Sequence, residues 1–380
     1  MDERPDATRP ADLMEIVPYS NAHRHAIERM NMTLQTAGSE WQFPPKERPA
    51  NADQLPVWME SFIAVDREGA YGGYLLKHQQ FFAAGRPLEV GDLQLPVSMG
   101  QIDGSYAHVS AALLIDVLRR SPVCYALGLG SEETQFAKLL GAAGWEYRPV
   151  PFYFSVKAAN RFARNISLPP DRSRLQQLLR LLGRLRLAGL ALRLRRALGS
   201  RRSTERALYT NVRELPRFDG TANELFKAHA PYYSLVGDRR VSVLNSLYPE
   251  SDGRCLRIVV ERDGRAIGWA LLLDTMMRDH KYFGDMRVGT LADCFAAPDD
   301  APAVVAAADD ALTARGVDLI VSNQLHPAWC GALEGAGYEL GPSNFFFYSS
   351  EALREALSAQ PEWENGIHMN RGDGEGPGNL

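Results

Sequence analysis

The sequence predicts an α/β protein in which one unit, a mixed β-sheet with helices on both faces, occurs twice. At 380 residues the chain exceeds what one hydrophobic core usually supports. Residues 140–154 and 333–347 are identical at seven of fifteen positions with a spacing of 193, and residues 65–76 match 260–271 at a spacing of 195. Two independent matches at nearly one spacing indicate a duplicated domain, with copies at 12–158 and 206–352.

In the first copy, apolar runs predict strands and amphipathic runs predict helices. The expected order is a strand at 13–19, a helix at 21–35, a hairpin of 60–65 and 71–82, a strand at 93–99, a helix at 106–120, a strand at 123–129, a helix at 132–143 and a closing strand at 147–156. Asn21 suits the start of the first helix, and Gly144 suits the end of the last.

The second copy repeats this order from about Leu208. We expect a helix at 221–229, a hairpin at 256–273, a strand at 289–295, a helix at 301–315, a strand at 318–322, a helix at 327–335 and a strand at 344–349. Strands followed by helices in both copies favour mixed sheets that are covered on both faces, with each copy closing its own sheet.

An arginine-rich linker, 159–205, joins the copies. Residues 161–202 hold twelve arginines and one acid, Asp171, which leaves a net charge near −15 on the rest. Leucines gather on one face of an expected helix from Arg174 to Leu198. This helix is expected to be either an interdomain strut or an anchor on an anionic membrane. Nucleic acid is not expected, because the run lacks aromatic residues for base stacking.

The remaining composition bounds the protein's class. The four cysteines, Cys124, Cys255, Cys294 and Cys330, show no paired spacing, so neither a metal site nor a disulfide framework is predicted. With no secretory signal and no apolar run long enough to cross a bilayer, we expect a cytoplasmic protein, with peripheral contact to the inner face of the membrane if the arginine helix is an anchor. The glycine-rich, acidic end of the chain, 353–380, is expected to be a flexible tail; a strap over the domain cleft is the alternative.

The order of elements resembles the GNAT superfamily of acyl-CoA N-acyltransferases, in both halves of the chain. Ala-Ala-Gly-Trp at 142–145 and Gly-Ala-Gly-Tyr at 335–338 look like that family's glycine-aromatic end of the penultimate helix. The chain is also similar to Fem-type aminoacyltransferases and to GNAT-like proteins associated with polysaccharide synthesis. The resemblance implies two tandem domains and acyl-CoA as a co-substrate.

The resemblance also implies a thioester site in the first copy. There, the loop after the fourth strand would direct backbone amides and a helix N-terminus at the pyrophosphate. Gln101 and Gly104 match the family's loop pattern, whereas Asp103 and Tyr106 depart from it. The predicted cofactor-binding residues are Met99, Gln101, Asp103, Gly104, Ser105, Tyr106 and Ala107. The corresponding loop of the second copy, 295–300, has no glycine, one proline and two acids.

Candidate catalytic groups are few. The family's tyrosine, the general acid toward the leaving thiolate, falls on Leu140 and Leu333, neither of which can donate a proton. His326 at the start of a second-copy helix and Asp293 on its fourth strand are the predicted bases, with a surface helix residue and a structural ion pair as the alternatives.

Three functions agree with these observations. The first is an acyltransferase that moves an acyl group from acyl-CoA to an amine on a sugar, an amino acid or a cell-envelope precursor. The second is Fem-like aminoacyl transfer. The third is a catalytically inert scaffold that kept the fold and lies on a membrane or a partner. The missing tyrosines favour the scaffold, and fold alone does not decide among the three.

Overall fold

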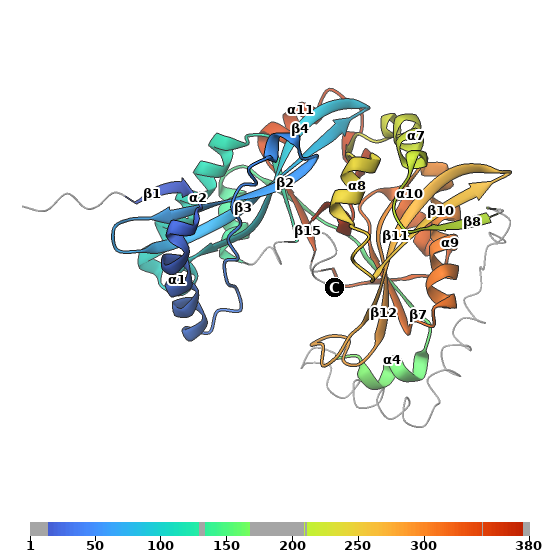
Figure 1. The fold of residues 1–380 in the computed structure, drawn as a ribbon, viewed down its shortest axis with the longest axis horizontal. Coiled ribbons are helices and arrows are strands. Elements are labelled where there is room, and N and C mark those ends of the chain that lie inside the picture. The colour runs from blue at the N-terminus through green and yellow to red at the C-terminus, as the bar shows by residue number, and fades with distance from the viewer. Residues whose placement is uncertain (1–13, 129–133, 168–208, 210, 344, 375–380) are drawn as a thin grey trace, which may run out of the picture. The chain divides into compact units, whose positions relative to one another are not determined.

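The computed structural model describes residues 14–128, 134–167, 209, 211–343 and 345–374, and its chain divides into two compact units (Figure 1). The first unit takes its described residues from Met1–Gln79, Glu89–Tyr147 and Phe347–Ala356. The second takes its described residues from Gln80–Leu88, Arg148–Phe346 and Leu357–Leu380. The two repeats of the sequence therefore do not fold as two uninterrupted stretches of chain.

The first unit is built on the strand order β1-β2-β3-β4-β5-β15-β6. Its elements are β1 (Glu15–Pro18), α1 (Arg24–Thr36), β2 (Val57–Val65), β3 (Ala70–Ala83), β4 (Arg86–Ser98), α2 (Ala107–Arg120), β5 (Cys124–Leu127), α3 (Gln135–Ala142), β6 (Glu146–Pro149), β15 (Phe346–Ser349) and α11 (Glu351–Leu357). The β4–β5 pair is parallel, while β2 with β3 and β5 with β15 are antiparallel. The mixed sheet was predicted from the sequence.

The second unit is built on the order β14-β7-β13-β12-β11-β10-β8, with β12–β13 as its parallel pair. Its elements are β7 (Phe152–Val156), α4 (Ala159–Asn165), β8 (Asn211–Leu215), α7 (Gly220–His229), β9 (Leu235–Gly237), α8 (Val241–Leu247), β10 (Cys255–Arg262), β11 (Arg265–Met276), β12 (Arg287–Ala296), α9 (Ala301–Ala314), β13 (Leu319–Asn323), α10 (Pro327–Gly335), β14 (Glu339–Gly341) and β16 (Ile367–His368). The end of β3 contributes to this unit, because Phe81 and Phe82 pair with β9.

The last strand of each repeat lies in the sheet of the other. β7 ends the first repeat but pairs with β13 and β14, and β15 ends the second repeat but pairs with β5. The expectation that each copy closes its own sheet is therefore wrong. The expected single strand at 147–156 is also wrong, because it splits into β6 and β7 around Pro151, which has no N–H for a strand ladder.

Both repeats use a strand glycine where a helix packs closely on the sheet. A Cβ placed on Gly72 would lie 2.8 Å from the carbonyl oxygen of Val97 and 3.0 Å from a methyl carbon of Val109 in α2. A Cβ on Gly268 would lie 2.6 Å from a methyl carbon of Val304 in α9. Any larger side chain would push the helix away from the strands.

Each unit has its own core. In the first, α1 and β2 bury a cluster that includes Ile27, Leu34 and Ile63, and in the second, α9 packs against β11 and β12 through alanines and valines. Within the part of the chain that is described, no helix is long and apolar enough to cross a membrane. The expected arginine-rich helix at 174–198 lies outside the described residues.

The C-terminal segment corrects the expectation of a flexible tail. Residues 367–374 are buried except for the partly exposed Arg371, and they form β16 and a 3₁₀ turn at Arg371–Asp373 inside the second unit. Asn370 begins this turn with a capping box. The Asn370 side chain accepts the backbone N–H of Asp373, and the Asp373 side chain accepts the backbone N–H of Asn370. Polar residues that cannot form a core of their own are here ordered by polar partners.

Candidate functional site

The parallel strands of each unit diverge after a short ladder. In the first unit, β4 pairs with β5 at Gly91–Cys124 and Asp92–Tyr125, and β4 then continues to Ser98. In the second unit, the ladder of β12 with β13 ends at Leu291–Ser322, and β12 continues to Ala296. Backbone groups on the diverging edges need partners. We call these places the first and the second strand opening.

A local irregularity in the strand accompanies each divergence. The β11–β12 register shifts so that Ala292 has no partner between Leu291 and Asp293. In β4, Leu95 has a φ of 43°, which is left-handed and uncommon for a leucine. Bulges of this kind bend a strand and redirect its edge.

The cofactor-binding residues predicted from the sequence lie together at the entrance of α2. They occupy two successive 3₁₀ turns, Met99–Gln101 and Gly104–Tyr106, and Ala107 begins the helix. Apart from its neighbours in the chain, Gly104 has no heavy atom within 4 Å of a Cβ placed on it. The ring of Tyr106 stacks on Tyr71, with centroids 5.3 Å apart.

Several amides of this loop already have acceptors. Gly100 donates to the Ser98 hydroxyl oxygen at 3.0 Å, and Asp103 donates to the Met99 carbonyl at 3.0 Å. Ser105 donates to the Asp103 carboxylate at 2.9 Å, and this bond lowers the pKa of Asp103. A pyrophosphate would therefore meet a negative charge and would compete for N–H groups that are in use. Binding of the kind predicted requires the turn to open.

A buried ion pair, which the sequence analysis did not single out, lies beside the end of the β4–β5 ladder. Lys77 Nζ is 3.3 Å from Asp92 Oδ2, and both side chains are almost fully buried. Gln94 also donates to Asp92. One feature of the sequence could have indicated this ion pair. Lys77 lies within an apolar run of β3, and a buried lysine requires a partner.

Asp293 is fully buried and is surrounded by donors. Arg239 Nε donates at 3.2 Å, the Tyr248 hydroxyl at 2.9 Å, and Asn370 Nδ2 at 2.9 Å. The backbone N–H of Cys294 is a fourth donor. A carboxylate that already accepts four hydrogen bonds is poorly placed to accept a further one from a substrate amine. These contacts favour the structural ion pair over the predicted catalytic base.

His326 is the N-cap of α10, and its Nδ1 accepts the N–H of Ala328 at 3.1 Å. In the neutral ring the proton therefore lies on Nε2, which leaves no lone pair there for a substrate proton. Burial lowers the pKa of His326 to about 4. Both observations weigh against the predicted role as a base near neutral pH. His326 and Asp293 nonetheless belong to one region, since both lie beside His368.

Leu140 and Leu333, which stand where the family has its tyrosine, are fully buried core residues. A side chain at either position lies in the core and does not reach solvent. A thiolate leaving group would need another proton source.

The second strand opening is filled by the C-terminal segment. The Leu325 N–H donates to the Met369 carbonyl at 3.0 Å, and Gln324 bridges to Asn370. Asp373 lies 2.8 Å from Arg239, so this guanidinium joins two carboxylates, Asp293 and Asp373. This cluster is not predictable from local sequence, because Arg239, Asp293 and Asp373 are far apart in the chain.

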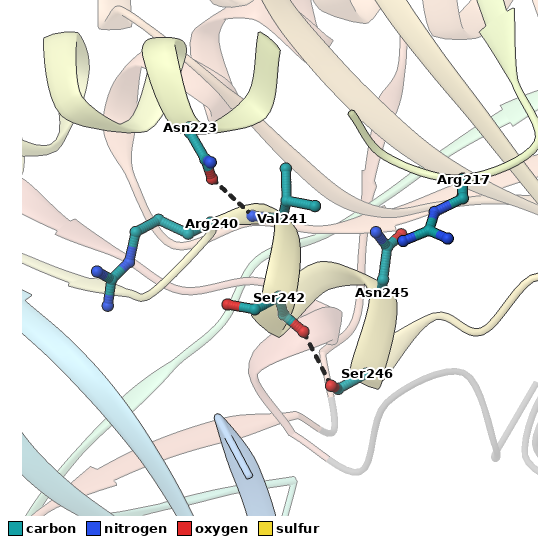
Figure 2. A pocket seen from close by; sticks show the side chains of 7 residues that line it. All are labelled: Arg217, Asn223, Arg240, Val241, Ser242, Asn245 and Ser246. Carbon is teal, nitrogen blue, oxygen red and sulfur yellow. Dashed lines mark hydrogen bonds between the residues drawn. The ribbon is translucent and has the colours of Figure 1, made fainter. Parts of the chain in front are cut away.

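A surface pocket of the second unit lies between α7 and α8 (Figure 2). Its lining is polar except for Val241 and consists of Arg217, Asn223, Arg240, Val241, Ser242, Asn245 and Ser246. In Figure 2 the two arginine side chains extend to opposite sides, and Arg240 pairs with Asp238. Asn223 accepts the Val241 N–H. The guanidinium groups do not converge on one point as an anion site requires. Among the described residues, no cluster of histidine, cysteine and acidic side chains suits a metal ion.

Comparison with known proteins gives information on the fold. The sequence matches no family model and no curated protein. The structure is similar to a conserved protein of unknown function from Enterococcus faecalis, described as a probable N-acyltransferase, with a TM-score of 0.50 and 9% identity over 90% of this chain and 73% of that one.

Two further solved structures match most of the chain with lower scores. A GCN5-related N-acetyltransferase from Anabaena variabilis gives a TM-score of 0.49 at 9% identity, covering 88% of this chain and 72% of that one. The N-myristoyltransferase of Saccharomyces cerevisiae with bound myristoyl-CoA gives 0.48 at 12% identity, covering 91% and 82%. The chain thus shares its α/β fold with the probable N-acyltransferase from Enterococcus faecalis.

Proposed function

We propose that this protein is an acyl-CoA-dependent N-acyltransferase whose thioester binds at the first strand opening, near Gln101–Ala107. One contrast carries the proposal. The second opening is filled by the chain's own residues 367–373, whereas the first leads to α2 through Gly104, which has open space around it. The first turn of α2 has no acidic residue, which suits a phosphate group, and Asp103 in the turn before it is a charge that opposes this.

The proposed reaction is the attack of a neutral amine on the thioester carbonyl. The N–C bond forms, the C–S bond breaks, the amine loses a proton, and the thiolate of CoA leaves and takes one up. The acceptor class is an amine on a sugar, an amino acid or a cell-envelope precursor. His326 and Asp293, the bases predicted from the sequence, are engaged with Ala328 and with Arg239 and Tyr248, so the proposed acceptor of the amine proton is water. Fem-like transfer of an aminoacyl group would use the same fold.

A non-catalytic binding protein is the second candidate, and a specific observation favours it. The loop amides at 100, 103 and 105 already have acceptors, and the tyrosine positions are buried leucines. A protein with these features could bind an acylated ligand without turnover. Peripheral contact with an anionic membrane through Arg174–Leu198 stays part of this proposal, as does a cytoplasmic location.

Titration calorimetry with CoA, followed by assays of free thiol release from acetyl-CoA with a panel of amines, tests both candidates. We expect one CoA per chain. The matched variants are Gly104→Glu, which adds a charged side chain at the loop, and Gly253→Glu, which adds it at a distant glycine that also has open space. Loss of CoA binding in Gly104→Glu alone supports the first opening as the site.

Thiol release separates the two functions. Amine-dependent release supports the transferase, and binding without release supports the binding protein. No binding of CoA to the folded wild-type chain would contradict both. Co-sedimentation with anionic and neutral vesicles tests the membrane contact, which equal and negligible binding to both would exclude.

A further inference from the structure

The C-terminal segment, residues 367–374, forms backbone hydrogen bonds with the strands around the second strand opening. β16 pairs in parallel with β9 at Ile367–Leu235 and His368–Val236. The next residues turn to the end of β13, where Leu325 and Gln324 bond to Met369 and Asn370. An extended peptide backbone is therefore recognised by strand-type bonds on two sides, which is a known way for a protein to hold a peptide.

Side chains add two polar anchors. The Asn370 amide donates to Asp293, and the Asp373 carboxylate accepts from Arg239. All four side chains are fully buried, so these bonds are made without competing water. The anchors select an asparagine followed three residues later by an aspartate.

The backbone between the anchors leaves room only for glycine. A Cβ on Gly372 would lie 2.2 Å from the Tyr248 hydroxyl oxygen and 2.8 Å from an Asp293 carboxylate oxygen. The Gly372 N–H donates to Asn370 Oδ1 and keeps the turn closed. Tyr248 and Asp293 are themselves bonded, so neither can move away without loss of that bond.

One feature opposes the docked state. His368 is fully buried among Tyr233, Trp329 and Phe295, and neither of its ring nitrogens has a hydrogen-bond partner. Burying an imidazole without partners is unfavourable, and release of the segment would return the ring to water. The segment is connected to the rest of the chain through exposed residues at 361–362 and 364–365, so release would break the β16–β9 pairing and the bonds of Ser234 to the carbonyls of Trp363 and Gly366.

We propose that the second strand opening is a binding site for an extended peptide, and that its occupant is this chain's own C-terminal segment, held as a displaceable intramolecular ligand. While the segment is docked, no other ligand can enter between β12 and β13. The class of ligand that could replace it is a peptide with the Asn-x-Gly-Asp pattern of residues 370–373. This inference does not depend on acyl transfer.

The test uses the full chain with Gly372→Val, which expels its own segment, and Gly253→Val as a matched control. The probe is a fluorescent synthetic peptide of residues 361–374. We expect it to bind the Gly372→Val chain about 100-fold or more tightly than the wild-type or Gly253→Val chains, whose sites are occupied at a high effective concentration. A peptide with Asn370→Ala should not bind, while one with Asn365→Ala, at an exposed position, should bind normally.

Equal binding of the peptide to all three folded chains, or no binding to Gly372→Val, would overturn the proposal. If circular dichroism shows that Gly372→Val is unfolded, hydrogen exchange of the wild-type chain decides. A displaceable segment exchanges the amides of Asn370, Gly372 and Gly374 through local opening, at least about tenfold faster than the amides of β12. Exchange at the same rate as β12 would make the segment an integral part of the core.

Discussion

The two strand openings arise from the same topology and have different contents. In the first, the entrance of α2 carries Gly104 with open space, and a single acid, Asp103, caps the turn. In the second, Pro298 and two acids precede α9, and the C-terminal segment lies between the strands. The difference shows that two similar strand arrangements can leave openings of different content, one filled by an internal contact and one not filled by that segment. Four predictions test this comparison.

The largest effect is expected from Arg239→Ala. This change leaves Asp293 and Asp373 buried without their common cation, which should destabilise the second unit by about 3–5 kcal/mol. Urea unfolding measures the loss, and Arg217→Ala, at an exposed arginine, is the control and should change stability by less than about 0.5 kcal/mol. Equal effects of the two substitutions would show that the buried cluster contributes nothing.

Replacing a strand glycine by alanine should lower stability more where the helix packs more closely on that strand. Gly268→Ala is expected to cost about 2–3 kcal/mol and Gly72→Ala about 1–2 kcal/mol, because the Cβ on Gly268 has the closer contact. Gly253→Ala, where a Cβ meets no neighbouring atom, serves as the reference. Thermal unfolding of the three variants gives the ranking. A larger cost at Gly72 would contradict the packing argument.

Acid should destabilise the second opening before the first. Burial, and then the positive charge of Arg239, lowers the pKa of His368 to about 3, from 6.5 in the released chain. The docked state is therefore fully favoured above pH 6.5 and loses stability as the pH falls toward 3, by about 2 kcal/mol at pH 5. His326, with a pKa near 4, acts in the same direction.

The charged or titratable groups that contribute to this effect come from several elements: Arg239, Asp293, His326 and Asp373. Hydrogen exchange of residues 367–374 at pH 7 and pH 5, corrected for intrinsic rates, measures it. His368→Phe, which removes the titrating ring, should remove most of the pH dependence. An unchanged pH dependence in that variant would assign it to the other groups.

The smallest effect concerns Asp103 in the first opening. Asp103→Asn removes a negative charge and weakens the acceptor for the Ser105 N–H. If CoA binds there, its affinity should rise about two- to fivefold at low salt, and the gain should shrink as ionic strength increases. Calorimetry in two salt concentrations checks this, with Asp299→Asn in the second repeat as the control. A gain in the control alone would place the phosphate in the second repeat.

Local patterns predicted much of the fold. The hairpin of β10 and β11 follows from Arg-Asp-Gly at 262–264, where Asp263 and Gly264 both take the positive φ that a tight turn needs. Helices α2 and α9 follow from their apolar faces, whereas Gln101 and Gly104 stay a prediction from the resemblance. The buried cluster around Asp293 was not predicted, because its partners Arg239, Tyr248 and Asp373 are distant in the sequence.

By itself, the sequence predicted the order of most strands and helices in each half and the mixed sheet, because periodicity and turn residues act over a few positions. The tertiary structure alone decided that β7 and β15 exchange sheets and that residues 367–374 fill the second opening. Strand edges in the two sheets offer the same backbone N–H and C=O groups, so the choice of partner depends on long-range packing and buried charge rather than on local sequence.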